Sequence, residues 1–178
     1  MAIEISENFK QSSIIFKSYD YSSPRVYFLT VCSGNRVCYF GNIVDGIMIS
    51  FPTCEIVRKI WTKLPEKFTS VDLDAFIIMP NHIHGIIVLN NEDRGLIHRK
   101  IIRFFKAKSA KTIQDNCFQR FDWQHSYYEH IVRSTEELNA VRHYIINNPI
   151  RWALDRENQL SRNFNMDLNE YYRDISKK

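Results

Sequence analysis

The sequence predicts an α+β fold, in which helices cover an antiparallel sheet mainly on one face and a further helix lies near the C-terminus. Two observations predict it. Segments rich in β-branched and aromatic residues alternate with segments whose apolar residues recur every three or four positions. These segments follow one another as strand, helix, strand, strand, helix, strand and helix. This order is typical of a ferredoxin-like split βαβ arrangement that is extended by one helix.

The first strand is predicted over residues 25–32 (RVYFLTVC), because this run is dense in β-branched and aromatic residues. Residues 34–36 (GNR) follow as a turn signal. Beyond the turn, we expect a short return strand over residues 37–40.

The first helix is predicted over residues 50–68, with Ser50 or Thr53 as its cap. Two long strands follow, over residues 71–79 and 83–89. The helix prediction rests on apolar side chains at helical spacing, which are Val57, Ile60, Trp61 and Leu64.

Pro80-Asn81 predicts a tight turn between those two strands, and residues 90–95 predict a loop. Helical spacing returns over residues 99–114, and residues 123–133 (WQHSYYEHIVR) predict the last strand.

The final helix is predicted over residues 135–147. Ser134 is a suitable N-cap, and Glu137 at the third helical position completes a capping box. Pro149 ends the helix.

The 178 residues are expected to form one domain, with a core over about 25–154 and a polar tail over 155–178. With 44% hydrophobic and 25% charged residues, the composition excludes a disordered chain. No apolar run approaches the roughly 18–20 residues of a membrane span, and no signal peptide is recognisable, so a cytoplasmic location is expected. The four cysteines are scattered and predict free thiols, and the net charge of +4 permits a polyanionic partner.

The clearest feature for chemistry is the pair His82-Ile83-His84. Residues two apart on a strand project from the same face, so the two imidazoles would converge on one point. Two neutral imidazoles supply half of a metal site, with further ligands from elsewhere in the fold. Half-buried histidines without a ligand are the ordinary alternative, but this pair opens a wholly apolar strand (GIIVL), where polar rings need partners.

A second feature is the segment YIINNP over residues 144–149. Tyr144 and Asn148 are four residues apart, so they share one face of the predicted helix. A tyrosine hydroxyl beside a metal-bound phosphate is a credible nucleophile. Equally, Tyr144 could be a core aromatic residue and Asn148 the last helical residue before a proline.

A third feature is the basic segment over residues 99–111 (RKIIRFFKAKSAK), which contains no acidic residue. Arg99, Arg103 and Lys106 fall on one stripe of the predicted helix. Together with Lys100, they could follow a DNA phosphate backbone. A solvated basic face is the ordinary explanation of such a run.

Taken together, these residues resemble the single-tyrosine HUH transposases, in particular the REP-associated tyrosine transposases. The resemblance covers roughly residues 25–154. It is carried by the order and spacing of four blocks, which are YFLTVCSGNR, FIIMPNHIHGIIVL, WQHSYYEHIVR and YIINNPIRWAL.

The resemblance implies a ferredoxin-like fold and an enzyme that cleaves and rejoins single-stranded DNA near a hairpin. It implies that His82, His84 and Asn148 hold Mg²⁺ or Mn²⁺. It also implies that Tyr144, on the extra C-terminal helix, attacks the phosphodiester to give a 5′-phosphotyrosine and a free 3′-hydroxyl. Related enzymes often carry Gln in place of Asn148, whose shorter amide must reach further.

Two other functions fit parts of the sequence. A binding protein for single-stranded DNA or RNA could keep the fold without cleavage, although binding alone needs neither the histidines nor Tyr144. A structural zinc protein would use the histidines with a cysteine, but no cysteine lies at a zinc-ligand spacing from the pair. Related enzymes include dimers and monomers, so this chain is expected to be a monomer or a homodimer.

Overall fold

A four-stranded antiparallel sheet forms the centre of the computed structural model, which describes residues 25–90, 97–117, 120–161, 163, 166–167 and 169–171. The strands lie in the order β4-β5-β1-β6, and every neighbouring pair is antiparallel. This is the strand order of the split βαβ arrangement, so the predicted fold class is confirmed. The strands are β1 (Arg25–Cys32), β4 (Val71–Ile78), β5 (His82–Leu89) and β6 (Tyr128–Val132).

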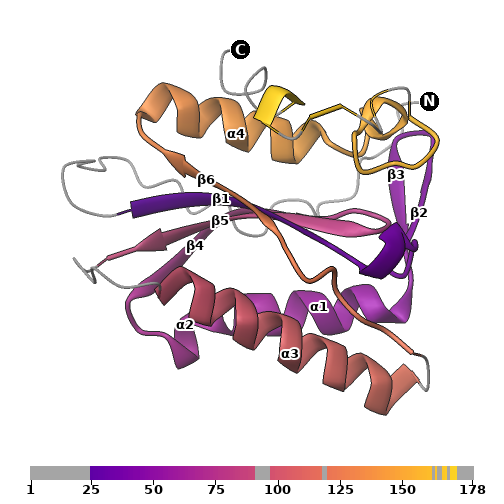
Figure 1. Ribbon diagram of the computed structural model, residues 1–178, viewed down its shortest axis with the longest axis horizontal. Helices are drawn as coiled ribbons and strands as arrows, with labels where there is room; N and C mark the ends of the chain where they lie inside the picture. The colour runs from indigo at the N-terminus through magenta and orange to yellow at the C-terminus, as the bar shows by residue number, and fades with distance from the viewer. Residues whose placement is uncertain are drawn as a thin grey trace, which may run out of the picture.

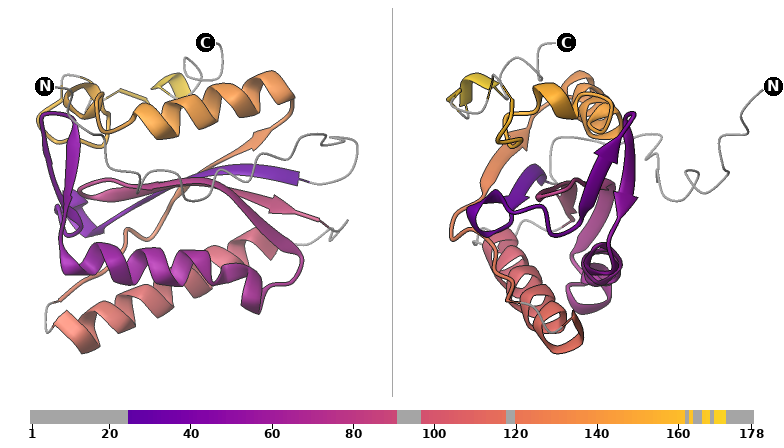
Figure 2. Two further views of the ribbon diagram at one scale, coloured as in Figure 1. Left: turned by 180° about the vertical axis from the view of Figure 1, so that it is seen from behind. Right: turned by 90° about the vertical axis from the view of Figure 1, so that its right-hand side faces the viewer.

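Helices cover both faces of the sheet, but unequally (Figures 1 and 2). Helices α1, α2 and α3 lie on one face and α4 lies on the other, so helices cover mainly one face, as predicted. A separate apolar core fills each side of the sheet, one around Trp61 and Phe105 and one around Phe28 and Val141. The helices are α1 (Pro52–Thr62), α2 (Leu64–Lys67), α3 (Ile97–Cys117) and α4 (Thr135–Asn147).

The predicted return strand over residues 37–40 is wrong, because a hairpin of β2 (Gly41–Val44) and β3 (Ile47–Ser50) follows instead. The backbone before it is held by turn contacts, including the N–H of Phe40, which donates to the carbonyl of Pro80 at 3.0 Å. Asp45 and Gly46 join the two strands with φ values of 50° and 76°. An Asp-Gly pair with positive φ at both residues is a strong hairpin signal, and it was present in the sequence.

The helix predicted over residues 50–68 is interrupted at Lys63, which separates α1 from α2. Pro65 explains the interruption, because a proline has no N–H to donate and its ring clashes with the preceding turn. Neither predicted cap is used. Ser50 belongs to β3, the hydroxyl of Thr53 donates to the carbonyl of Tyr39, and α1 begins after Phe51.

Strand β6 is shorter than the predicted 123–133. Trp123 forms only an isolated bridge with Ser33, and its indole N–H donates to the hydroxyl of Ser109 at 2.9 Å. The remaining strands and α3 agree with prediction to within three residues at each end. The loop predicted over 90–95 lies, apart from Asn90, outside the described residues.

Helix α4 has the predicted bounds and the predicted cap, since the Ser134 hydroxyl accepts a hydrogen bond from the N–H of Glu137 at 3.1 Å. The Glu137 carboxylate bonds to the N–H of Arg133 at 2.6 Å rather than that of Ser134, so the capping box is shifted by one residue. Among the described residues no helix is long and apolar enough to cross a bilayer. The four cysteines are free thiols, as expected.

Gly85, in the middle of β5, allows α1 to approach the sheet. The Trp61 ring lies directly over it, stacked on Phe76 with ring centroids 4.7 Å apart. A Cβ at position 85 would overlap the six-membered ring of Trp61.

We therefore expect Gly85→Ala to destabilise the protein by about 1–3 kcal/mol, as overpacking of a filled core does. Thermal unfolding should show this as a decrease in Tm of about 2–4 °C per kcal/mol. In a Trp61→Phe background, which removes the overlapping ring, the same substitution should cost less. An equal cost in both backgrounds would contradict this account of the glycine.

Candidate active site

Strand β5 presents His82 and His84 on the face of the sheet that α4 covers. Both residues are fully buried, and their Nε2 atoms lie 3.0 Å apart. Each Nδ1 atom has a partner on the opposite side of the ring. Asn81 Oδ1 lies 2.9 Å from Nδ1 of His82, and Thr30 Oγ1, opposite His84 in the β1–β5 register, lies 2.9 Å from Nδ1 of His84. Both rings therefore direct Nε2 toward one point.

Helix α4 brings Tyr144 to the same point. Its hydroxyl lies 3.2 Å from Nε2 of His84, and its ring packs edge-on against Phe28. The helix is seated by Leu138, Val141 and Ile145, which are buried in the core on this side of the sheet. The structure thus brings together three of the residues that the sequence indicated for the site.

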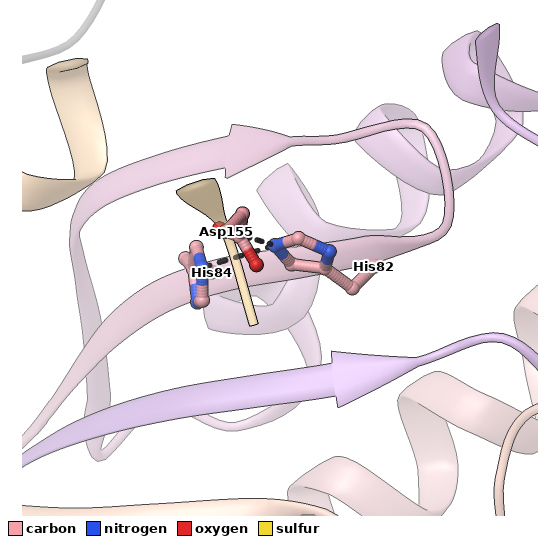
Figure 3. Close-up of side chains that lie close together, drawn as sticks. All are labelled: His82, His84 and Asp155. Carbon is pink, nitrogen blue, oxygen red and sulfur yellow. Dashed lines mark hydrogen bonds and ion pairs between the residues drawn. The ribbon is translucent and has the colours of Figure 1, made fainter. Parts of the chain in front are cut away.

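Asp155 is the residue of this cluster that sequence reasoning missed. It follows a 3-10 turn over Trp152–Leu154 and is 1% exposed. Its Oδ2 lies 3.5 Å from the Tyr144 hydroxyl and 4.0 Å from Nε2 of His82. Figure 3 shows its carboxylate pointing toward the space between the two imidazoles. One ligand atom from each of His82, His84 and Asp155 can be chosen so that all three lie within 4.8 Å of one another.

Asn148, the third metal ligand implied by the resemblance, lies beside this cluster. Its residue is 1% exposed, and neither its side-chain nitrogen nor its oxygen makes a well-formed hydrogen bond to any described residue. The amide is still close enough to Asp155 to offset part of the rise that burial gives to the pKa of that carboxyl group. Burying an amide without hydrogen-bond partners costs free energy, and such polar atoms commonly bind an ion or a water molecule.

The electrostatics of the site favour neutral imidazoles. Burial lowers the pKa of His82 to about 4 and that of His84 to about 3, with the neighbouring His82 adding to the effect on His84. Burial also raises the pKa of Asp155. At neutral pH both rings are therefore uncharged, which is the state in which imidazole binds a metal.

A second cluster of buried charges, around Glu157, lies next to the site at the end of β1. Glu157 is 1% exposed and pairs with Arg36 at 2.6 Å and with Arg156 at 2.8 Å. The Cys32 thiol donates to the same carboxylate at 3.3 Å. Burial alone would raise the pKa of Glu157, but the charged guanidinium groups of Arg36 and Arg156 hold it below its ordinary value. Glu157 is thus a buried anion, tied to both arginines.

Comparison with known proteins identifies the family. The model of the family described as "Transposase IS200 like" matches residues 50–148, which include both histidines, Tyr144 and Asn148. This chain belongs to the IS200-like transposase family. Asp155 and Glu157 lie beyond the matched segment.

Two relatives show how far the similarity extends. An uncharacterised protein of Haemophilus influenzae is 35% identical over 164 residues, which cover 81% of this chain and 91% of that protein. A solved REP-associated tyrosine transposase bound to a REP hairpin has the same fold, with a TM-score of 0.53 and 20% identity. That match covers 76% of this transposase and 72% of the other chain.

The basic residues indicated for DNA binding do not lie at the site of this transposase. They belong to α3, on the opposite face of the sheet from α4 (Figure 1). Lys106 donates to the backbone carbonyls of Gln124 and His125, and Arg99 lies 3.7 Å from Glu129. Lys100 and Arg103 are exposed.

An ion pair holds α4, the helix that carries Tyr144, against the edge of the sheet. Asp74, at a register irregularity in β4, accepts two hydrogen bonds from the Arg142 guanidinium, at 2.9 and 2.5 Å. Arg142 lies on α4 two residues before Tyr144, and the Asp74 side chain is 5% exposed. This contact therefore anchors α4 within two residues of Tyr144.

We expect Arg142→Gln to lower the free energy of unfolding by about 1.5–3 kcal/mol, because it leaves a buried carboxylate without its charged partner. Urea unfolding measures this directly. Glu55→Gln serves as the matched control, since its pair with Arg58 is exposed and should contribute less than about 1 kcal/mol. Similar losses for the two variants would show that the Asp74–Arg142 pair does not anchor α4.

Proposed function

We propose that this transposase cleaves and rejoins single-stranded DNA beside a hairpin, with Tyr144 as the nucleophile. The observation that carries the proposal is the distance of 3.2 Å between the Tyr144 hydroxyl and Nε2 of His84 within one chain. The hairpin bound to the REP-associated tyrosine transposase of the same fold supports a hairpin substrate here. Because histidine and tyrosine come from one chain, a monomer acting in cis would suffice.

The buried cluster fits a divalent cation. Adjacent ligands in an octahedral site with bonds of about 2.0–2.1 Å lie about 3 Å apart, and the Nε2 atoms of His82 and His84 are separated by 3.0 Å. Asp155 would add an anionic oxygen, and the Asn148 amide has capacity for a further bond. A mixed set of imidazole and carboxylate donors suits Mn²⁺ better than Mg²⁺.

A divalent cation bound there would neutralise charge on the non-bridging oxygens of a phosphodiester. Tyr144 would form a bond from its hydroxyl oxygen to phosphorus while the bond from phosphorus to the 3′ oxygen breaks. The proton that the phenol loses balances the proton that the 3′ oxygen gains, so no co-reactant is consumed. The products are a 5′-phosphotyrosine and a 3′-hydroxyl, and reversal on another 3′ end rejoins the strand.

The decisive test is covalent capture of DNA. The protein is incubated with Mn²⁺ and a hairpin oligonucleotide labelled at its 3′ end, and the adduct is resolved on a denaturing gel. Tyr144→Phe should abolish the adduct and change the DNA dissociation constant little, because it removes only the attacking oxygen.

Tyr128→Phe is the matched control. Tyr128 lies on β6 and packs near Phe28 of β1, so its hydroxyl should be dispensable for the adduct. An adduct that persists in Tyr144→Phe, for instance one linked to Tyr171, would refute the nucleophile assignment. Salt-sensitive DNA binding without an adduct under any metal would favour the binding-only alternative.

Asp155 and Asn148 can be separated as ligands by calorimetric titration with Mn²⁺ in the absence of DNA. We expect Asp155→Asn to weaken Mn²⁺ binding by about 10-fold or more, because it removes the only anionic donor of the proposed set. Asn148→Ala should have a smaller effect, because the amide is neutral. Asp45→Asn, in the exposed β2–β3 turn, is the control and should bind as the wild type does. Unchanged affinity in Asp155→Asn would remove Asp155 from the ligand set.

A further inference from the structure

We infer that Asn81 is a positioning residue, which fixes His82 in the tautomer that carries its hydrogen on Nδ1 and so keeps the Nε2 lone pair directed into the site. The relevance of this inference to metal binding rests on the proposed function. The tautomer itself depends on neither metal nor DNA. The inference rests on the hydrogen bonds of the Asn81 side chain, whose donors and acceptors can all be paired in only one orientation of the amide.

The Asn81 amide is 1% exposed and has three partners. Its Nδ2 donates to the carbonyl of Arg36 at 3.1 Å and to that of Glu157 at 2.8 Å. Both partners are carbonyl oxygens, which only accept, so the NH₂ end of the amide must face them. Its oxygen therefore faces Nδ1 of His82 at 2.9 Å. An amide oxygen cannot donate, so the hydrogen in that contact belongs to the imidazole.

The two carbonyls are brought together by the buried charge cluster around Glu157. The Arg36 side chain forms an ion pair with the Glu157 carboxylate at 2.6 Å. The backbone carbonyls of the same two residues accept the hydrogen bonds of Asn81, so the ion pair holds both acceptors in place. Arg36 has a φ of 54°, in the left-handed region that non-glycine residues rarely adopt. Such a backbone persists only where its surroundings hold it, and here they hold the Arg36 carbonyl against Asn81.

His84 has a different kind of partner. A threonine hydroxyl can donate or accept, so Thr30 is compatible with either tautomer of His84. With His82 fixed, Nε2 of His82 carries no hydrogen, so Nε2 of His84 either donates to it at 3.0 Å or accepts from the Tyr144 hydroxyl at 3.2 Å. To offer a lone pair to a cation, His84 has to carry its hydrogen on Nδ1, facing Thr30. One imidazole is thus preset and the other is adaptable.

Nitrogen NMR tests this in the metal-free protein. The imidazoles are labelled with ¹⁵N and recorded at pH 7 with a chelator, and signals are assigned from His82→Gln and His84→Gln. We expect His82 to be the Nδ1–H tautomer. A wild-type His82 with its hydrogen on Nε2 would overturn the inference without any variant.

Variants then separate positioning from mere support of the fold. Asn81→Ala should release His82 to the Nε2–H form or to a mixture, whereas Asn81→Asp, which restores an acceptor, should return it to Nδ1–H. Thr30→Val is the matched control and should alter the signals of His84 while leaving the tautomer of His82 unchanged. Retention of Nδ1–H in a folded Asn81→Ala protein would overturn the inference.

Metal affinity provides a second readout. We expect Asn81→Ala to weaken Mn²⁺ binding by about 10- to 100-fold, as loss of a group that orients a metal-bound histidine does, and Asn81→Asp to recover part of it. Equal affinity of Asn81→Ala and wild type would overturn the positioning role. A wild-type protein with the expected His82 tautomer but no Mn²⁺ binding would refute the proposed function and leave the role of Asn81 supported.

Discussion

Two uncharged imidazoles buried side by side on one strand are the constraint on which the rest of the site depends. Bulk water does not reach four ring nitrogens of side chains that are 0% exposed, and here the protein supplies a partner for each Nδ1 and encloses both Nε2 atoms. The partners come from β1 and from the β4–β5 turn, and the enclosure comes from α4 and the segment after it. Antiparallel pairing of β1 with β5 places Thr30 opposite His84, so sheet register and site chemistry are linked.

Local sequence patterns predicted those features that depend on near neighbours in the chain. The bounds of β1 and α4 were correct, because a strand dense in branched residues and a helix with a Ser134 cap are specified by their own residues. Convergence of His82 and His84 follows from the two-residue period of a strand. Two errors have equally local causes, since Asp45-Gly46 signals a hairpin and Pro65 interrupts a helix, and both signals could have been used.

Contacts between distant segments could not be predicted in this way. Asp155 and Glu157 lie in a polar stretch without periodicity, and only the folded chain brings them to residues 82 and 36. The basic residues of α3 show the same limit of local patterns. Helical spacing grouped Arg99, Arg103 and Lys106 correctly on α3, but it could not tell that a sheet separates this helix from Tyr144.

The position of Asp155 and Glu157 in the chain has a consequence for how the unit that builds the cluster is delimited. Both carboxylates lie beyond residue 148, where the match to the family model ends. A chain cut back to the matched segment would keep both histidines and Tyr144, but it would lack the carboxylate beside them and the anion that pairs with Arg36. The segment that the family model matches is therefore smaller than the part of the chain that encloses the two imidazoles.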